Sequence, residues 1–323
     1  MSYKSIDELP TFYKSLYDLP REERFVSGHR LCAGCMAGTI VRHLMKVAGK
    51  DAVVVNVTSC VEITSVVDLY TPWLNPWIHP LFENAGAVAS GVVEAYKVLK
   101  RKGELPADRD IKVIALAGDG GTFDIGFQSL SGMLERGHDV LYVCYDNEAY
   151  MNTGIQRSAA TPKYAWTTTT PAGKVWRGEW RVKKPLFDIA VAHGIPYAAT
   201  TNPAYPLDMV NKFKRALTIK GPKLVHVLMP CTTGWRFNTN LGPTIARLAV
   251  ETGVWINMEY CCGEFRVTTP VKFRKPVKEY LKLQGRFRHL TEEEIADIQR
   301  IVDEQVERVN KLVGKEVIGP VKA

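Results

Sequence analysis

Residues 111–156 constrain the fold more than any other part of this 323-residue chain. An apolar run at 113–117 leads into Gly118, Asp119, Gly120 and Gly121, and an amphipathic stretch at 126–136 precedes a second apolar run at 140–145. This pattern predicts a strand, a sharp turn, a helix and a second strand. Strands joined through a helix are parallel, so both are expected to end at the same edge of one sheet.

Polar residues follow both predicted strands. Asp119 stands between glycines, whose missing β-carbons let backbone N–H groups close around a phosphate. Asn147 follows the second strand and offers an amide oxygen. Ligands bind at the carboxyl edge of such sheets, and Mg²⁺ prefers oxygen ligands together with substrate phosphates. The sequence therefore predicts a magnesium and phosphate site, with a helix-capping role for Asp119 as the structural alternative.

The spacing of these motifs resembles a known signature. Asn147 follows the Gly-Asp-Gly sequence after 26 residues, as in thiamine diphosphate enzymes. The resemblance implies that Asp119 and Asn147 bind Mg²⁺ through their side chains, with a backbone carbonyl near Ala149 as a third ligand. A long polar loop follows, in which Asn152, Thr153 and Gln156 could donate hydrogen bonds to a diphosphate or a substrate.

Composition is that of an ordinary globular protein, with 46% apolar and 24% charged residues. No apolar run is long enough to span a membrane and the N-terminus has no signal-peptide core, so we expect a cytoplasmic protein. The net charge is +8, and the basic residues are scattered along the chain apart from runs at 177–184 and 272–288. These runs lack a nucleic-acid-reading motif and indicate a solvated face or a docking surface for an acidic electron carrier.

Seven cysteines are many for a cytoplasmic chain, where disulfides are rare. A metal or cluster site is therefore the first alternative to disulfide bonds as the role of these cysteines. Four of them stand at the ends of predicted elements. Cys32 and Cys35 form a CxxC motif before a predicted helix at 36–47, and Cys60 and Cys231 follow predicted strands at 52–57 and 224–228. Cys144 lies inside a strand, where a buried hydrophobe is the better interpretation.

Four thiolates suit either structural zinc or a [4Fe–4S] cluster. Zinc sites with four cysteines usually use two short turns that each carry a pair of cysteines. This chain offers one pair and two distant single cysteines, which favours the cluster over zinc. A thioredoxin-like dithiol at Cys32 and Cys35 would need a preceding strand that the sequence lacks. Cys261 and Cys262 compete with Cys231 for the fourth position, but their neighbours predict a strand and turn at the periphery.

The order of predicted elements indicates an α/β fold with a doubly wound, mostly parallel sheet. Residues 1–24 are polar, contain two Leu-Pro pairs and are expected to form an arm that lies on a partner subunit. Residues 25–260 form the predicted α/β domain and residues 261–323 a C-terminal extension. Thr291 and Glu294 predict a capping box for a helix at 292–312. His79, Glu83 and Asn84 are further candidate pocket residues before a helix at 85–100.

Several motifs together resemble the β subunit of 2-oxoacid:ferredoxin oxidoreductases, most closely the pyruvate-specific ones. They are GHRLCAGC, the Cys after Thr-Ser, PWIH..FENA, GDGGTFDIG, DNEAYMNTG and a late Pro-Cys, and they span roughly residues 25–260. The resemblance implies thiamine diphosphate with Mg²⁺, and one [4Fe–4S] cluster bound by Cys32, Cys35, Cys60 and Cys231. Many relatives have Gly-Glu or Gly-Ile where this chain has Met36 and Ala37, so the surroundings of the cluster are expected to differ.

The activity implied by this resemblance is oxidative decarboxylation of a 2-oxoacid to acyl-CoA and CO₂, with electrons passed to ferredoxin. Pyruvate is the first candidate for the 2-oxoacid. The resemblance also implies a partner α subunit that activates the cofactor, further γ and δ subunits, and a catalytic Asn152 that hydrogen-bonds near the reacting centre. Cys60 and Asn84 are further candidate cofactor contacts. Two other functions remain: a non-redox thiamine decarboxylase or carboligase, and a non-catalytic electron-transfer or zinc-stabilised subunit. Iron content and bound thiamine diphosphate distinguish them.

Overall fold

A single eight-stranded sheet forms the centre of the computed structural model, which describes residues 3–66 and 70–322. Its strand order is β2-β1-β3-β4-β6-β5-β7-β8. The first six strands of that order pair in parallel, and β7 and β8 are antiparallel. The strands are β1 (Ala52–Asn56), β2 (Trp77–Ile78), β3 (Lys112–Gly118), β4 (Val140–Asp146), β5 (Tyr197–Thr201), β6 (Lys223–Leu228), β7 (Met258–Cys261) and β8 (Glu264–Val267).

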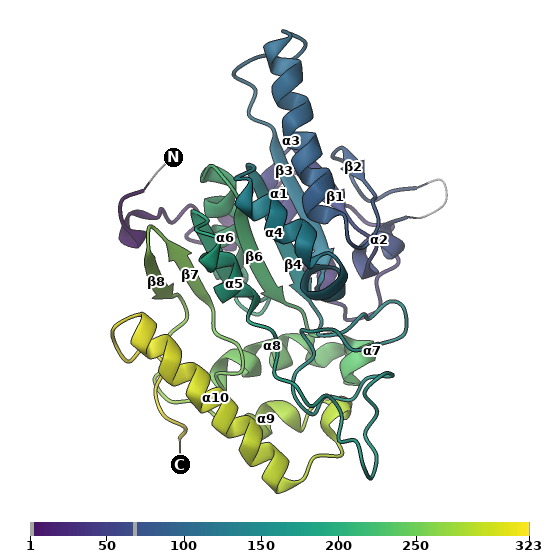
Figure 1. Cartoon of the computed structure of the whole chain (residues 1–323), viewed down its shortest axis with the longest axis vertical. Coiled ribbons are helices and arrows are strands. Elements are labelled where there is room, and N and C mark those ends of the chain that lie inside the picture. The colour runs from purple at the N-terminus through teal and green to yellow at the C-terminus, as the bar shows by residue number, and fades with distance from the viewer. Residues whose placement is uncertain (1–2, 67–69, 323) are drawn as a thin grey trace.

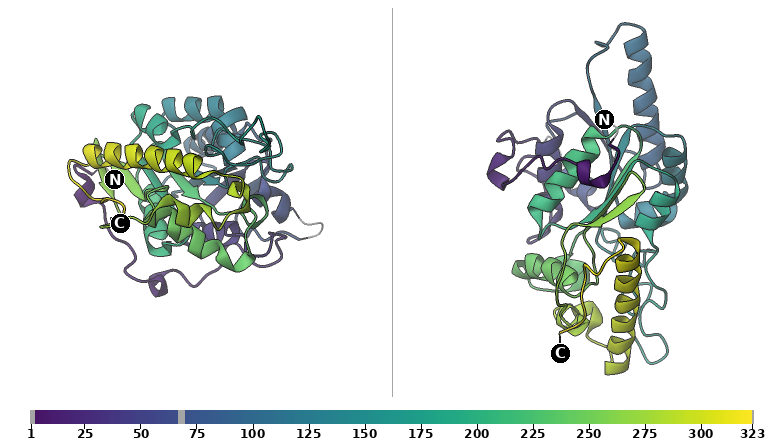
Figure 2. Two further views of the ribbon diagram at one scale, coloured as in Figure 1. Left: turned by 90° about the horizontal axis from the view of Figure 1, so that it is seen from below. Right: turned by 90° about the vertical axis from the view of Figure 1, so that its left-hand side faces the viewer.

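Helices cover both faces of the sheet, as Figures 1 and 2 show. One apolar core joins α3, α4 and α5 to the sheet, and a second joins α1 and α6 to its other face. The helices are α1 (Ala37–Ala48), α2 (Cys60–Ser65), α3 (Ala85–Arg101), α4 (Phe127–Glu135), α5 (Leu186–Ala192), α6 (Pro206–Thr218), α7 (Thr232–Trp235), α8 (Gly242–Glu251), α9 (Val277–Leu281) and α10 (Glu292–Leu312). In the described residues no helix is both long and apolar enough to cross a bilayer.

The central strands end together. Gly118 of β3 pairs with Tyr145 of β4, and Asp146 of β4 pairs with Leu228 of β6. Every residue of β4 is buried, which is expected because helices pack on both faces of a parallel sheet. The predicted doubly wound, mostly parallel α/β sheet is confirmed, and its carboxyl edge gathers the loops that carry the candidate site residues.

The turn after β3 differs from the sharp turn that the sequence predicts. Residues Gly120–Ile125 form a wide helical turn of the π type, closed by a 2.8 Å hydrogen bond from Gly126 N to Gly121 O. A β-carbon on Gly126 would lie 2.4 Å from Gly121 O, and one on Gly121 would lie 2.9 Å from Phe82 O. Close packing against the residues before α3 therefore sets the width of this turn, which is frequent at functional sites.

The N-terminal arm packs on its own chain. Ile6, Leu9 and Tyr13 are buried in the core beneath α6. Asn211 of α6 accepts hydrogen bonds from the backbone N–H groups of Phe12 (2.8 Å) and Tyr13 (3.0 Å). The arm has only short 3₁₀ turns, as its Leu-Pro pairs suggest, but it is an integral layer of the fold rather than a free segment.

The C-terminal helices lie beyond the carboxyl ends of the parallel strands (Figure 1). The predicted capping box at the start of α10 is present, with Glu294 N donating to Thr291 Oγ1 (3.2 Å) and Thr291 N donating to Glu294 Oε2 (2.8 Å). The β7–β8 hairpin spans residue 261, where the sequence predicts the start of the extension. The extension therefore begins within the sheet.

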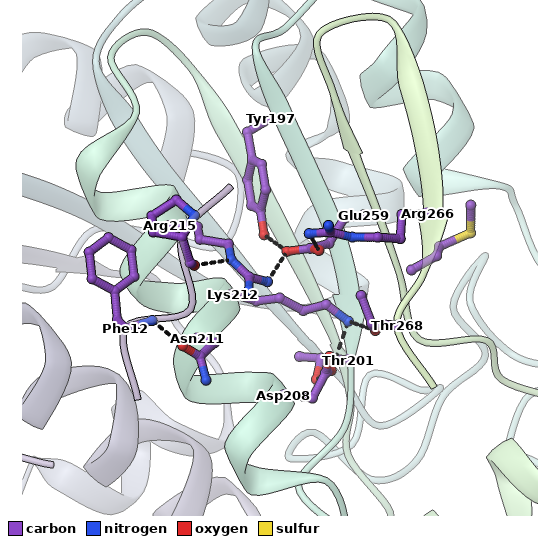
Figure 3. A network of polar contacts seen from close by, with 12 residues as sticks. Phe12, Tyr197, Thr201, Asp208, Asn211, Lys212, Arg215, Glu259, Arg266 and Thr268 are labelled. Atoms are coloured by element: carbon purple, nitrogen blue, oxygen red, sulfur yellow. Dashed lines mark hydrogen bonds and ion pairs between the residues drawn. The ribbon is translucent and has the colours of Figure 1, made fainter. Parts of the chain in front are cut away.

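A buried ionic network connects α6 to the antiparallel end of the sheet (Figure 3). Glu259 of β7 accepts hydrogen bonds from Tyr197 Oη (2.6 Å), Arg215 Nη1 (2.7 Å) and Arg266 Nη2 (2.9 Å). Burial alone would raise the pKa of Glu259, but Lys212 and Arg215, together with the donors around it, lower it to about 2. Glu259 is therefore ionised throughout the neutral range.

Replacing Glu259 with glutamine is expected to destabilise the fold by about 3–5 kcal/mol, because Arg215 and Arg266 would lose a buried counter-charge. The folded pKa of about 2 lies below the ordinary value of 4.5, so this stabilisation is present above pH 4.5 and is lost as the pH falls toward 2. Urea unfolding of both proteins between about pH 3 and 7, which covers the plateau and the upper part of this window, should give a difference that shrinks with acidity. The control is Glu293→Gln on the exposed face of α10, and a pH-independent difference would contradict this account.

Candidate active site at the carboxyl edge of the sheet

A pocket with about 310 Å³ of empty space lies at the carboxyl edge of β1, β3 and β4. Its walls come from the loops that follow these three strands and from Phe82. They include nearly all the residues that the sequence predicts for cofactor binding. The lining residues are Thr58, Ser59, Cys60, Phe82, Gly118, Asp119, Gly120, Gly121, Tyr145, Asn147, Ala149, Tyr150, Met151, Asn152 and Thr153.

Four predicted pocket residues lie elsewhere or act differently. Asn84 is at the N-cap position of α3, without a side-chain capping hydrogen bond, and neither it nor Glu83 lines the pocket. His79 contacts Thr58 Oγ1 (3.0 Å) through Nε2 and Glu62 Oε1 (3.2 Å) through Nδ1, so it braces the loop after β1. Gln156 donates to Thr153 O (2.8 Å) and closes the loop that carries Asn152.

Gly120 has a steric requirement at the floor of the pocket. A β-carbon on Gly120 would lie 2.4 Å from the ring of Tyr150, so any larger residue would displace that ring. The ring of Tyr150 therefore packs directly against the backbone at the start of the helical turn, and both line the pocket. Backbone without a β-carbon can approach a phosphate group closely.

Three oxygen atoms converge next to this backbone. The terminal atom of the Asn147 amide lies 2.9 Å from Asp119 Oδ1 and 2.9 Å from Ala149 O. The structure places the amide oxygen there, where it faces only acceptors, whereas the reversed amide would donate two hydrogen bonds. The oxygen orientation needs a cation between the three atoms, and the nitrogen orientation needs none.

Asp119 is almost fully buried, and its charge is poorly compensated. Burial, followed by the nearby carboxylate of Asp146, raises the pKa of Asp119 well above its ordinary value. Asn147 N donates to Asp119 Oδ1 (3.2 Å), and Ser158 Oγ donates to Oδ2 (2.5 Å). These hydrogen bonds favour the ionised carboxylate but do not offset the effect of burial on its pKa. A bound cation would therefore stabilise the ionised carboxylate at this position.

Charged residues from distant segments hold the turn after β4. Lys183 Nζ contacts Asp146 Oδ2 (2.6 Å) and Glu148 Oε1 (2.8 Å), and Arg286 Nη2 contacts Glu148 Oε2 (2.6 Å). Glu148 has a φ of +65°, which is unfavourable for a residue with a side chain. The two ion pairs fix this conformation, which places Asn147 and the Ala149 carbonyl on the same side of the turn.

Sequence reasoning missed these supporting residues. Lys183 and Arg286 come from loops far along the chain, and Ser158 follows the pocket loop. One signal was present: two acids, Asp146 and Glu148, flank Asn147 at the end of an apolar strand. Buried acids need partners, so this pattern indicates basic residues supplied from elsewhere in the chain.

The structure brings four cysteines together beside the pocket. Cys32 and Cys35 precede α1, Cys60 begins α2, and Cys231 caps α7. Burial raises the pKa of Cys35 to about 11, with further contributions from Cys231 and Cys32. Burial also raises the pKa of Cys60, to which Cys231, Cys35, Asp119 and Cys32 add in that order. Cys60 thus belongs both to the cysteine group and to the pocket wall.

The other cysteines lie apart from this group. Cys144 is completely buried inside β4, as expected for a structural hydrophobe. Cys261 and Cys262 are at the tip of the β7–β8 hairpin, with their sulfur atoms 2.8 Å apart and Cys262 Sγ 3.2 Å from Tyr3 O. The structure therefore groups Cys231, rather than either hairpin cysteine, with Cys32, Cys35 and Cys60.

No three His, Cys, Asp or Glu side chains within residues 3–66 and 70–322 are placed to hold one metal ion. The atoms that converge at Asp119 include the Asn147 amide and the Ala149 carbonyl, which are not His, Cys, Asp or Glu side chains and so do not belong to that set. The four cysteines share one electrostatic environment without meeting at a single point.

Comparison with known families agrees with the arrangement of the pocket. The family described as the C-terminal TPP-binding domain of thiamine pyrophosphate enzymes matches residues 58–227. Pyruvate synthase subunit PorB of Methanocaldococcus jannaschii is 57% identical over 88% of this chain and 96% of its own length. Ketoisovalerate oxidoreductase subunit VorB of Pyrococcus abyssi is 47% identical over 97% of this chain and 100% of its own.

A solved structure supports the fold. The 2-oxoglutarate:ferredoxin oxidoreductase of Magnetococcus marinus superposes with a TM-score of 0.55 at 20% identity, over 74% of this chain and 84% of that one. The family match covers β3, β4 and the loops that line the pocket, beginning just after β1, and the relatives match over most of their length. The chain belongs to the β subunits of the multi-subunit 2-oxoacid:ferredoxin oxidoreductases, with a thiamine diphosphate-binding domain.

Proposed function

We propose that this chain binds thiamine diphosphate with Mg²⁺ and one [4Fe–4S] cluster, and that its complex oxidatively decarboxylates pyruvate to acyl-CoA and CO₂ while reducing ferredoxin. The position of Cys60 carries this proposal. Its thiol lines the same pocket as Asp119 and is also influenced by Cys32, Cys35 and Cys231. A cofactor that releases electrons in the pocket would therefore have an electron acceptor at its wall.

The spacing of the three converging atoms fits a magnesium site when the Asn147 amide keeps its oxygen toward the other two. Mg²⁺ binds oxygen in octahedral geometry at about 2.0–2.1 Å, which places neighbouring ligand oxygens about 2.9 Å apart. The Asn147 amide lies at that distance from both Asp119 Oδ1 and Ala149 O. Asp119, Asn147 and the Ala149 carbonyl would hold the ion, while the backbone from Gly118 to Gly121 would contact the diphosphate.

The cysteine group fits an iron–sulfur cluster better than zinc. A tetrahedral zinc site needs four sulfur atoms about 2.3 Å from one centre. A cluster distributes its thiolates over separate iron atoms and so needs a wider arrangement. Cys32, Cys35, Cys60 and Cys231 are close enough to alter one another's pKa, yet no three of them surround a single ion position.

Thiamine diphosphate would supply an electron sink for breaking the bond between the carboxylate and the carbonyl carbon, and the cluster would accept electrons singly. The chain's own residues position these groups. Tyr145 Oη accepts from Val61 N (3.2 Å), which fixes α2 and hence Cys60 against the pocket. Asn152 is exposed at the mouth of the pocket, where its amide could hydrogen-bond to the substrate.

The complex would need further subunits. By family resemblance, an α subunit would complete the cofactor site, γ and δ subunits would complete the complex, and ferredoxin and coenzyme A would be the co-substrates. Pyruvate is proposed because four relatives that are 51–57% identical to this chain over the aligned residues are pyruvate synthase subunits. A branched 2-oxoacid is the second candidate because the VorB relatives align over 97% of the chain. The ratio of kcat/KM for pyruvate and 3-methyl-2-oxobutanoate, measured on the assembled complex, decides between them.

The test is an electron paramagnetic resonance spectrum of anaerobically purified protein reduced with dithionite and quantified against iron. The proposal expects the signal of one reduced [4Fe–4S] cluster per chain, together with stoichiometric thiamine diphosphate. An iron-free protein with stoichiometric zinc would refute the redox assignment. Adding pyruvate and coenzyme A to the oxidised complex without ferredoxin should make this signal appear, because the substrate would reduce the cluster.

Replacing Lys183 with methionine is expected to weaken binding of thiamine diphosphate and Mg²⁺ by about 10–100-fold, because the turn that carries Asn147 would lose its ion pairs. Lys183→Arg, which keeps the charge, should retain more of the affinity. Calorimetric titration with thiamine diphosphate at saturating Mg²⁺ measures the effect. The control is Lys174→Met in the exposed part of the same loop, and iron content should not change in any of these variants.

A further inference from the structure

Helix α7, which follows Cys231, is attached to the walls of the candidate active site at two points. Trp235 Nε1 donates to Asn147 O (2.8 Å), at the turn that carries the proposed magnesium ligands. Gly234 lies against the thioether of Met151, and Met151 itself lines the pocket. The four residues of α7 therefore connect the pocket with one of the four grouped cysteines.

The contact between Met151 and α7 depends on the absence of a β-carbon from Gly234. A β-carbon there would lie 2.1 Å from Met151 Sδ and 2.4 Å from Met151 Cε, so a larger residue would have to displace the thioether. The backbone of Met151 is also held, because its carbonyl accepts from Ile155 N (3.2 Å) in a loop closed by paired hydrogen bonds between Tyr150 and Gln156. The thioether is therefore positioned against α7 by the structure on both sides of the contact.

Gly234 is also the residue whose backbone reaches the Cys231 sulfur. Gly234 N donates to Cys231 Sγ (3.4 Å), and Cys231 is only 8% exposed. Trp235 N donates to Cys231 O (3.0 Å), so the turn that directs the Gly234 N–H toward the sulfur is held by α7 itself. Met151 packs on Gly234 from the pocket and so lies between the pocket and this hydrogen bond.

The surroundings of a cysteine ligand affect the redox behaviour of an iron–sulfur cluster. Solvent exposure and hydrogen bonds to the sulfur atoms are two of the factors that set the reduction potential. A cluster bound by four thiolates carries more negative charge when it is reduced, and water stabilises the more highly charged state. Water next to Cys231 would therefore raise the potential and make the reduced cluster a weaker reductant.

We propose that Met151 is a positioning residue that keeps pocket water away from Cys231 and so holds the cluster at a low potential. The inference rests on the proposed function, because it needs a cluster bound by Cys231. An unbranched thioether is able to fill an irregular gap, and Met151 packs against the apolar core that includes Cys231 and Trp235.

The test is an anaerobic redox titration of the full-length chain carrying its cluster, followed by the electron paramagnetic resonance signal of the reduced cluster. Met151→Ala is expected to raise the ratio of reduced to oxidised cluster about tenfold at a fixed solution potential, which is a shift of about 59 mV for a one-electron couple. Met151→Gln, which keeps the length of the side chain but brings a polar amide, should shift the potential in the same direction. Met151→Leu is the matched control, since its apolar side chain has a similar volume, and it should titrate like the wild type.

A double variant tests the contact itself. In the Met151→Ala background, Gly234→Ala adds a methyl group to the space that the thioether has left, so the double variant should titrate closer to the wild type than Met151→Ala does. Unchanged potentials in Met151→Ala and Met151→Gln, or a double variant no closer to the wild type, would overturn the role of Met151 and leave the cluster assignment intact. Absence of the cluster signal from the wild-type protein would instead refute the proposed function, and this inference with it.

Discussion

Replacing Asp119 with asparagine is expected to abolish thiamine diphosphate binding, with the dissociation constant raised by at least about 100-fold at saturating Mg²⁺. The substitution keeps the shape of the side chain, and the amide oxygen can still accept a hydrogen bond from Asn147 N. The amide nitrogen would then face Ser158 Oγ, which can act as the acceptor instead of the donor. It removes the one charged oxygen among the three that converge in the pocket. Calorimetric titration measures the loss directly.

Thermal unfolding separates this effect from misfolding. A saturating cofactor stabilises a folded protein by about 2.7 kcal/mol at 100 times its dissociation constant, so the wild-type protein should melt higher with cofactor than without it. Asp119→Asn should lose this shift and, without cofactor, be at least as stable as the wild type, because burial raises the pKa of Asp119 and so disfavours its charge. Asp124→Asn is the control, since Asp124 lies on the same helical turn and accepts from Ala159 N instead (2.9 Å). Cofactor affinity of Asp119→Asn within threefold of that of Asp124→Asn would contradict the assignment.

Replacing Cys231 with alanine is expected to eliminate the reduced [4Fe–4S] signal and to lower the iron content per chain, because the cluster would lose one of its four thiolates. Cys231 begins the short helix α7, and its sulfur accepts from Gly234 N (3.4 Å). A backbone donor to a thiolate is favourable for a cluster ligand, since hydrogen bonds to the sulfurs set the potential. Iron analysis and the spectrum of the dithionite-reduced protein measure the effect.

Cys262→Ala is the matched control because Cys262 is exposed on the β7–β8 hairpin, apart from the other four cysteines. This variant should keep its iron and its spectrum. The reverse result, loss of iron in Cys262→Ala and retention in Cys231→Ala, would move the fourth ligand to the hairpin. Cys231→Ala should retain thiamine diphosphate affinity while Asp119→Asn retains iron, so the two variants together test the two sites independently.

The sequence was most informative where chemistry follows an apolar strand. Asp119, Asn147 and Cys60 could be predicted as neighbours because parallel strands end at one edge, and the structure places all three in one pocket. The α10 capping box could also be predicted, since its two residues are only three apart. Asn84 does not line the pocket, although Phe82, two residues earlier, does. Proximity along the chain does not determine which way the N-terminus of α3 faces.

Other features depend on contacts that sequence spacing does not encode. The wide turn after Gly120 results from packing against residues before α3, about 40 positions earlier. Lys183 and Arg286 reach Glu148 from 35 and 138 residues away, and neither loop has a periodic pattern that indicates its position. The burial of the N-terminal arm likewise depends on Asn211, whose role appears only once α6 is in place.

The docking of the N-terminal arm has a consequence for synthesis on the ribosome. Its hydrogen-bond partners, Asn211 and Glu264, follow it by about 200 and 260 residues. At translation rates of about 5–20 residues per second, Ile6, Leu9 and Tyr13 would wait roughly 10–50 s before their docking surface exists. During that interval these apolar side chains are available to chaperones, so a segment made well before its partners is among the last to reach its native position.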